Sequence, residues 1–289
     1  MRFQWIADHT DEFDVAMMCR VLDVSRSGYY AWRDRPPSAR VLRRQTLFAQ
    51  IREEHDASRQ TAGAPKIKAA LVQSGIAVCL NTVAKYMRQG EIRSVRSKRF
   101  RPQTTDSRHD HAIAPNTLNQ DFVAAAPNRK WLCDITCIPT DEGFVYLASV
   151  LDVFSRRIVG WQMANHLRAE LCLDALHAAI NARQPDAGLL HHSDRGVQYA
   201  CDAYRQVLQD HAIHCSMSRT GNCYDNAMME SFHASLKLEA VYRLPGGQFR
   251  SKEQARQSIF EYIEVFYNRQ RRHSAIGYMS PVQFEASRH

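Results

Sequence analysis

Downstream of residue 130, three apolar runs typical of strands follow one another with no helix between them, and this pattern restricts the fold most. The runs are WLCDITCIP, FVYLASVLDVFS and RRIVGWQMA. Turn residues separate them, Asp141-Glu142-Gly143 after the first run and Ser155-Arg156-Arg157 after the second. Because short turns join antiparallel neighbours, the three runs predict an antiparallel meander.

The pattern then changes to alternating helices and strands. The helix-like RAELCLDALHAAIN is followed by a strand in GLLHHSD, a helix in DAYRQVLQDHAI, a strand in HCSMS and a helix in NAMMESFHASLKLEAV. The order is β-β-β-α-β-α-β-α, and we expect the fourth strand beside the first. Three antiparallel strands with two parallel additions, covered by helices, match the ribonuclease H-like architecture. We therefore expect an α/β core over residues 129–245.

A final helix is expected within residues 246–289, where it and a basic tail would pack on the core. Ser251 and Gln254 have the spacing of a capping box at the start of this helix.

The chain before the core predicts an all-α region with two helix-turn-helix-like segments, residues 1–37 and 38–92. In the first, Ser25 is a good N-cap for a second helix, and Pro36-Pro37 ends the segment. In the second, one helix covers about 42–55, another starts at Pro65, and a third is capped by Asn81 and ends before Gly90. A plain three-helix bundle is the alternative to a DNA-binding unit.

In a helix-turn-helix unit the last helix enters the major groove of DNA. The outward candidates on that helix are Thr82, Lys85 and Arg88. Residues 93–128 are polar and punctuated by proline, so we expect a linker there. Its basic run suits a phosphate backbone, although a solvated connector would look similar. The candidate DNA contacts in this run are Arg96, Lys98, Arg99 and Arg101.

The charge of the chain is unevenly distributed. Residues 1–130 carry 22 Lys and Arg against 13 Asp and Glu, whereas residues 131–289 carry 16 against 17. This distribution is typical of a protein whose basic N-terminal part binds nucleic acid and whose near-neutral C-terminal part has another role. The N-terminus is not typical of a signal peptide and the longest apolar run is too short to span a bilayer, so we expect a cytoplasmic protein. The eight cysteines are scattered without a Cys-x-x-Cys pair, which argues against a disulfide framework.

Three carboxylates carry the candidate chemistry. Asp134 lies in the middle of the first strand, Asp194 at the C-terminal end of the fourth, and Glu230 one turn into the helix after the fifth. In open α/β sheets, ligand sites favour such strand ends. Three converging carboxylates repel each other strongly unless cations lie between them. All-oxygen ligands suit Mg²⁺ or Mn²⁺, and two such ions about 4 Å apart support an in-line phosphoryl transfer.

A zinc site is the alternative reading of this region. It would use His191, His192, His211 and His214. Adjacent histidines on a strand point to opposite faces, so the first two cannot easily share one ion. On the helix of Glu230, by contrast, a single stripe collects polar side chains that could close the site on the sheet. These are Asn226, Glu230, His233 and Lys237.

At these motifs the chain closely resembles the DDE transposases of bacterial insertion sequences, specifically the downstream-frame (OrfB) proteins of the IS-three family, whose core is similar to retroviral integrase. The resemblance lies in WLCDITCIPTDEGFVYLASVLDVFSRRIVGW, HHSDRGVQY, GNCYDNAMMESFHASLKLE and YNRQRRHSAIGYMSPVQF, and it extends to VSRSGYYAW, GAPKIKAAL and NTVAKYM near the N-terminus. It covers essentially the whole chain.

The resemblance implies a transposase that cleaves and joins DNA strands at element ends. Asp134, Asp194 and Glu230 would be the catalytic triad and would hold two Mg²⁺ or Mn²⁺ ions. Lys237 would contact DNA, and Asn226 would help to orient the strand. The partners implied are double-stranded DNA (terminal inverted repeats and target), further copies of the chain in a homo-oligomer, and an upstream-frame (OrfA) protein, either separate or fused.

Two other functions are compatible with parts of the sequence. A DNA-binding regulator without catalysis would bind DNA in a salt-sensitive way but would not cleave it. A nuclease acting on RNA–DNA hybrids would use a similar core. The presence of all three acids disfavours the first, and the helix-turn-helix-like segments, which suit duplex DNA, disfavour the second.

Overall fold

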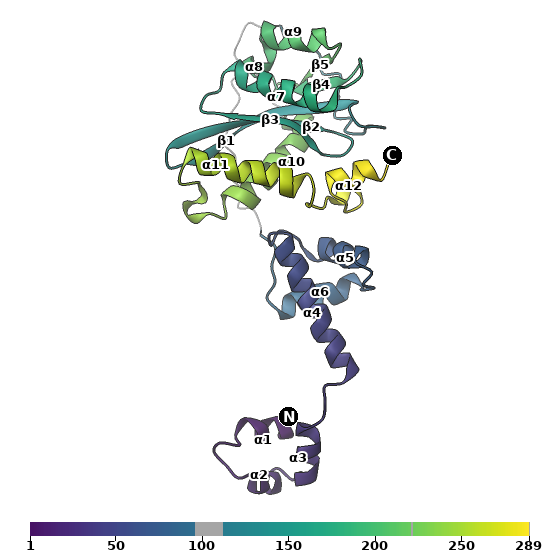
Figure 1. The fold of residues 1–289 in the computed structure, drawn as a ribbon, viewed down its shortest axis with the longest axis vertical. Coiled ribbons are helices and arrows are strands. Elements are labelled where there is room, and N and C mark those ends of the chain that lie inside the picture. Colours follow the sequence, from purple (N-terminus) through teal and green to yellow (C-terminus); the bar gives the residue numbers. More distant parts are fainter. Residues whose placement is uncertain (96–111, 221, 289) are drawn as a thin grey trace. The chain divides into compact units, whose positions relative to one another are not determined.

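The structure is a computed structural model that describes residues 1–95, 112–220 and 222–288. The chain separates into two compact units, Met1–Glu53 and Glu54–His289. Figure 1 shows the elements in sequence colours. No helix in the described ranges combines the length and the apolar character needed to cross a bilayer.

The first unit contains three short helices, α1 (Arg2–Asp8), α2 (Val15–Val21) and α3 (Arg26–Arg33). The sequence predicts α2 and α3, and the Ser25 side chain caps α3 by accepting a hydrogen bond from the Gly28 backbone. α1 was not predicted, because its apolar pattern is weak. Ile6 is its one fully buried residue.

Three further helices lie upstream of the sheet: α4 (Ala39–Ala57), which continues through the boundary between the units, α5 (Ala64–Gln73) and α6 (Leu80–Gln89). Ile67, Ala70 and Leu71 of α5 and Val83 of α6 are buried. The predicted cap of α6 is wrong. The N-cap is Cys79, and Asn81 lies in the first turn, because the helix begins before the asparagine.

The second unit is built on a mixed five-stranded sheet, and its topology confirms the predicted α/β class. The strands are β1 (Lys130–Thr140), β2 (Gly143–Asp152), β3 (Ile158–Ala164), β4 (Leu190–Ser193) and β5 (His214–Met217). Their order in the sheet is β3-β2-β1-β4-β5. β1, β2 and β3 are antiparallel neighbours, and β4 and β5 are parallel additions on the far side of β1.

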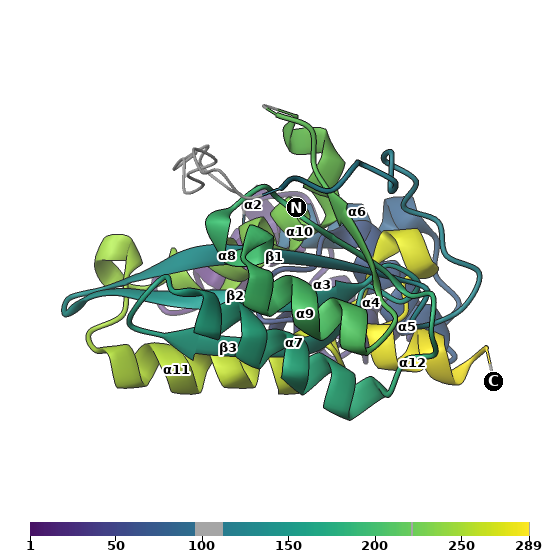
Figure 2. The ribbon, with the colours of Figure 1, turned by 90° about the horizontal axis from the view of Figure 1, so that it is seen from above.

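Helices cover both faces of the sheet, as Figures 1 and 2 show. One face carries α7 (Ala169–Arg183), α8 (Val197–Ala200) and α9 (Asp202–Asp210), and the other carries α10 (Ala227–Leu236) and α11 (Lys252–Phe260). Side chains alternate between the two cores along β1, with Leu132 in the α10–α11 core and Cys133 in the α7–α9 core. Gly160 lets α7 approach β3, since a Cβ atom there would lie 2.6 Å from the Ala179 Cβ and would overlap the Ala175 carbonyl.

Short irregular helices complete the unit. η1 (Cys223–Asn226) precedes α10, the π-turn η2 (Lys237–Val241) continues it, and η3 (Pro245–Gly247) leads to α11. The π-helical η4 (Glu261–Tyr267) follows α11, and η5 (Ser274–Ile276) precedes α12 (Pro281–Ala286).

The capping box predicted for α11 forms only in part. Ser251 accepts from the Gln254 backbone, but the Gln254 side chain accepts from the Arg250 backbone rather than from Ser251. A complete capping box lies instead at α12, between Ser280 and Gln283.

The end of the predicted linker packs on the core. Leu118 is buried in the α10–α11 core. The backbone amides of Thr117 and Leu118 donate to Ser216 Oγ of β5, and the Lys130 ammonium pairs with Asp121. The bonds to Ser216 join residues 98 and 99 positions apart, so composition alone could not reveal them.

Candidate active site

The pairing of β1 with β4 brings the first two predicted carboxylates to the same level of the sheet. The parallel register pairs Trp131 with His191 and Leu132 with His192. Continued by two residues, it sets Asp134 opposite Asp194, which directly follows the last residue of β4. Both side chains are half-buried. Asp134 and Asp194 therefore occupy neighbouring backbone positions on adjacent strands, at the carboxyl end of β4.

The electrostatic surroundings agree with this placement. Cys172 of α7 is a buried thiol, and burial raises its pKa above the usual range. The negative charges of Asp194 and Asp134 raise the pKa of the same thiol further. The Cys172 thiol therefore lies within electrostatic range of both carboxylates.

α10 contacts β1 through two side chains of the predicted polar stripe. The Asn226 Nδ2 atom donates a 3.1 Å hydrogen bond to the Cys133 carbonyl, next to Asp134. His233 Nδ1 lies 3.5 Å from the Asp134 carboxylate. Glu230 lies between these two residues on the stripe, four residues after Asn226 and three before His233, so it shares the side of α10 from which both contact β1.

The Glu230 side chain is exposed and does not complete a metal cage with the aspartates. Among the residues that the structure describes, no group of three His, Cys, Asp or Glu side chains lies close enough together to hold a metal ion. The sheet thus sets the two aspartates at one level on adjacent strands, and Glu230 lies on the side of α10 that contacts β1.

His233 is a residue of the site that was noted on the stripe but not assigned a role. Its Nε2 atom lies 3.1 Å from Ser149 Oγ, and its Nδ1 atom faces Asp134. Ser149 is the cross-strand partner of Asp134 in the β1–β2 register. The imidazole therefore links two neighbouring strands at the position of the first carboxylate. The spacing of three residues from Glu230 was the available signal.

Lys237, at the end of the same stripe, also lies near Asp134. Burial lowers the pKa of Lys237, and the nearby Cys137 and Asp134 act in the opposite direction. A half-buried ammonium beside the carboxylates can meet an anionic substrate group that enters the site.

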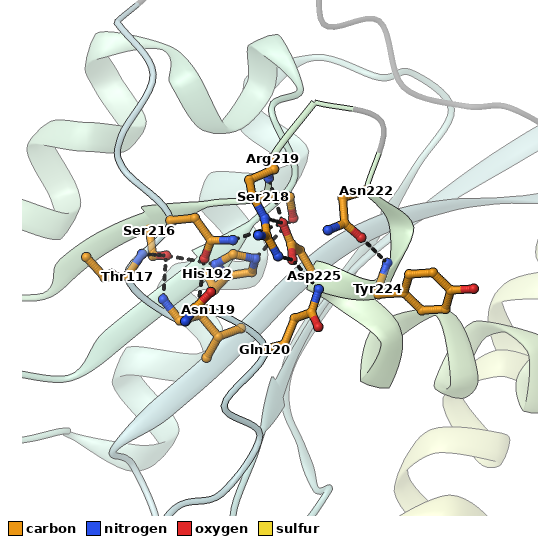
Figure 3. A network of polar contacts seen from close by, with 12 residues as sticks. Thr117, Asn119, Gln120, His192, Ser216, Ser218, Arg219, Asn222, Tyr224 and Asp225 are labelled. Atoms are coloured by element: carbon orange, nitrogen blue, oxygen red, sulfur yellow. Dashed lines mark hydrogen bonds and ion pairs between the residues drawn. The ribbon is translucent and has the colours of Figure 1, made fainter.

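A buried polar network holds the segment that leads into α10, and Figure 3 shows it at close range. Asp225 is fully buried and accepts hydrogen bonds from the Arg219 guanidinium, from Asn116 and from Gln120. The hydrogen bonds from Arg219 hold the pKa of Asp225 well below its usual range. The network ties the chain before β1 to the start of α10. It was missed, because a single acidic residue next to Asn226 gives no pattern.

The histidines considered for zinc have structural roles. His191 and His192 are buried on opposite faces of β4, as predicted. His191 Nε2 lies 2.9 Å from the Tyr204 hydroxyl, and the two His192 ring nitrogens lie 2.8 and 3.0 Å from Ser216 Oγ and Ser218 Oγ (Figure 3). The structural roles are those of His191 and His192, whereas His211 and His214 are exposed.

The candidate DNA contacts fall into three groups. Lys85 and Arg88 are exposed on α6, and Thr82 beside them is half-buried. Asn226 is buried, with its amide turned to β1 rather than to the surface. The remaining four lie outside the described residues: Arg96, Lys98, Arg99 and Arg101.

Comparison with known proteins gives family matches along most of the chain. Two family models described as integrase core domain match residues 124–223 and 211–281, and a model described as HTH-like domain matches residues 42–100. The 31 kDa protein of insertion element IS600 from Shigella sonnei is 42% identical over 272 residues, which cover 94% of this chain and 98% of the relative. The transposase InsF of insertion sequence IS3A from Escherichia coli K12 is 41% identical over 287 residues, which cover 99% of this chain and 98% of InsF.

Among solved structures, the catalytic core domain of HTLV-2 integrase in complex with magnesium overlaps 56% of this chain and 99% of that chain, with 14% identity and a TM-score of 0.43. An intasome of simian T-cell lymphotropic virus overlaps 75% of this chain and 70% of that chain, with 15% identity and a TM-score of 0.45.

Proposed function

We propose how this chain, which belongs to the IS3 family of integrase-core transposases, uses its sheet and α10 to cleave and join DNA. The chain is a polynucleotidyl transferase of the insertion-sequence type. The observation that supports the proposal is the β1–β4 register, which sets Asp134 level with Asp194, while Glu230 lies on the side of α10 that contacts β1. These three carboxylates are our candidates for the catalytic residues.

The donor set fits a divalent cation. Carboxylate oxygens are the ligands that Mg²⁺ and Mn²⁺ prefer, and two half-buried aspartates side by side are electrostatically costly unless a cation or a proton lies between them. We propose that Asp134, Asp194 and Glu230 hold two such ions, with the exposed Glu230 side chain closing onto the aspartates. When bound, the ions would activate the attacking oxygen and stabilise the leaving oxygen of the phosphodiester.

The protein itself contributes position and charge. His233 and Ser149 would keep the Asp134 carboxylate oriented, as outer partners of metal ligands do. Asn226 would fix α10 against β1 through its bond to the Cys133 carbonyl. Lys237 would contact the DNA strand next to the carboxylates, where its ammonium neutralises a phosphate.

We propose that the helical region upstream of the sheet binds the ends of the element. The HTH-like domain match over residues 42–100 and the exposed side chains of Lys85 and Arg88 on α6 support this. The basic run at Arg96, Lys98, Arg99 and Arg101 would contact the phosphate backbone on both specific and non-specific DNA. We propose that the functional segments are those expected from the sequence. They are two helix-turn-helix-like segments, a linker, the catalytic core and a C-terminal helix with its tail, at residues 1–37, 38–92, 93–128, 129–245 and 246–289.

The partners follow from the reaction. An element has two ends and a target, so we propose a homo-oligomer that holds both terminal inverted repeats and the target DNA. We further propose an upstream-frame (OrfA) partner or fusion, by similarity to the IS3-type relatives. Since the relatives are bacterial and the proposed substrate is DNA, we propose that the protein acts in the cytoplasm.

The test is Asp194→Asn. Cleavage and joining of end DNA in Mg²⁺ are expected to fall below detection, whereas binding of the same DNA in gel-shift assays should remain within about twofold. The variant removes a ligand charge without changing the DNA-binding helices. Strand transfer by the variant at the rate of the parent protein would refute the proposed site. If the parent protein bound DNA but did not cleave it, a regulator would be the better description.

A further inference from the structure

A cavity of about 280 Å³ lies between α5 and the segment that follows η4, away from the three carboxylates. Since a water molecule occupies about 30 Å³ in the liquid, the cavity can hold a small hydrated anion. Four cationic side chains line it and only one acidic side chain does. The cations are Lys66, Arg269, Arg271 and Arg272, and the acid is Glu54.

Two of these cations are already engaged. Arg271 forms a bidentate pair with the buried Glu239, at 2.9 Å from each guanidinium nitrogen to the carboxylate, and also donates to Ser235 Oγ. Arg272 donates to the Gln73 side chain and lies 3.9 Å from the Glu54 carboxylate. The negative charge of Glu54 is thus balanced by Arg272.

Lys66 and Arg269 supply the remaining positive charge. Within the described part of the chain, neither side chain has a hydrogen bond or an ion pair to a protein acceptor. Lys66 is half-buried, and burial together with the nearby Arg271 lowers its pKa to about 8, although the Glu239 carboxylate acts in the opposite direction. The same field acts on His273, whose pKa falls to about 2 because the ring is buried and lies near Arg271 and Lys66. A half-buried cation among arginines is costly without an anion.

We propose that this cavity binds a phosphate group through Lys66 and Arg269, with Arg272 at its rim. A tetrahedral anion would give the lysine ammonium an acceptor and would relieve the repulsion among the cations. The phosphate could belong to a DNA backbone or to a free phosphate-bearing molecule, since the recognition chemistry is the same. In either case the ligand would bridge α5 of the HTH-like region and the C-terminal segment of the core.

The first test uses the full-length protein and inorganic phosphate. Phosphate is expected to raise the Tm relative to chloride at equal ionic strength, and calorimetric titration should yield a saturable site. Lys66→Met should weaken phosphate binding about tenfold or more, which corresponds to about 1.4 kcal/mol and to the loss of one charge-assisted hydrogen bond. Lys68→Met, on the same helix but not lining the cavity, is the matched control and should bind like the parent protein.

Two further measurements complete the test. For binding of end DNA, Lys66→Met should lower the salt slope by about one if the ligand is a backbone phosphate. An unchanged slope, combined with the loss of inorganic phosphate binding, assigns the site to a free phosphate compound. Equal Tm of the parent protein in phosphate and chloride, or equal phosphate affinity of the parent and Lys66→Met, would overturn the proposal. None of these readouts depends on cleavage, so the proposed catalytic site is tested separately.

Discussion

Single residues decide how the Asp134 carboxylate is held. His233 lies between that carboxylate and Ser149 on the neighbouring strand. This arrangement keeps the imidazole in one orientation, because both ring nitrogens face polar atoms. A side chain with this role does not touch the reacting phosphate, so we describe it as a positioning residue.

His233→Ala is expected to raise the Mn²⁺ concentration needed for half-maximal cleavage about 10- to 100-fold, the usual effect of removing an outer partner of a metal ligand. His233→Gln keeps one polar group and should recover part of the loss. Calorimetric titration of Mn²⁺ into the variants measures the effect without cleavage. The positioning role would be wrong if the variants bound Mn²⁺ like the parent protein and lost only thermal stability.

Asp225 offers a second test at this scale. Asp225→Asn is expected to cost about 1–3 kcal/mol at pH 7, because the new amide N–H faces donors from Arg219, Asn116 and Gln120. The pKa of Asp225 is lower in the folded protein than in the unfolded chain, where it is about 3.9. The carboxylate therefore contributes fully to the free energy of unfolding above the unfolded-state pKa, and this contribution is lost as the pH falls through the folded-state pKa.

Denaturant unfolding at pH 7 and below pH 4 measures this difference. Asp121→Asn is the matched control, since the Asp121 carboxylate is exposed and its ion pair with Lys130 should contribute little to the free energy of unfolding. A stability gap between the parent protein and Asp225→Asn that stays constant as the pH falls would contradict the assignment.

At the scale of elements, the close approach of α7 to β3 depends on Gly160. Gly160→Ala should destabilise the protein by about 1–3 kcal/mol, because the added methyl group overlaps the α7 backbone at Ala175 and Ala179. Gln162→Ala, at an exposed position on the same strand, should change the free energy of unfolding by no more than about 0.5 kcal/mol. Equal unfolding midpoints of the two variants would show that α7 can move away at little cost.

The elements that could be predicted from sequence are those with strong local periodicity. The five strands, α7 and α9 have regular apolar patterns, and turn residues mark the ends of β1 and β2. α1 has a weak pattern and was not predicted. The cap of α6 was misplaced by two residues, since Asn81 is a better capping residue than Cys79 but the helix begins earlier. Helix ends depend on tertiary packing that sequence periodicity does not contain.

The same reasoning explains how far the site could be predicted. The strand order alone puts Asp134 and Asp194 on adjacent strands, and the helical stripe puts Glu230 on the same helix side as His233. The bonds from Asn226 to β1, and from Arg219, Asn116 and Gln120 to Asp225, join residues 6 to 109 positions apart. Contacts of this kind are set by the folded geometry and leave no periodic trace.

At the scale of the whole molecule, the chain joins a basic helical region to a near-neutral sheet domain that carries the proposed catalytic residues. The uneven charge predicts that DNA binding and catalysis respond differently to salt and to metal. Removal of divalent cations with a chelator should therefore abolish cleavage and leave end binding largely intact, as for Asp194→Asn.

The central claim is that Asp134, Asp194 and Glu230 hold divalent cations together when DNA is bound. An experimental structure of the protein with end DNA and Mn²⁺, measured at a wavelength where manganese scatters anomalously, tests it most directly. We predict two anomalous peaks about 4 Å apart, each within about 2.0–2.3 Å of oxygens from these three side chains. Anomalous peaks elsewhere, or a fully assembled DNA complex in which Glu230 lies outside coordination distance of the ions, would contradict this claim.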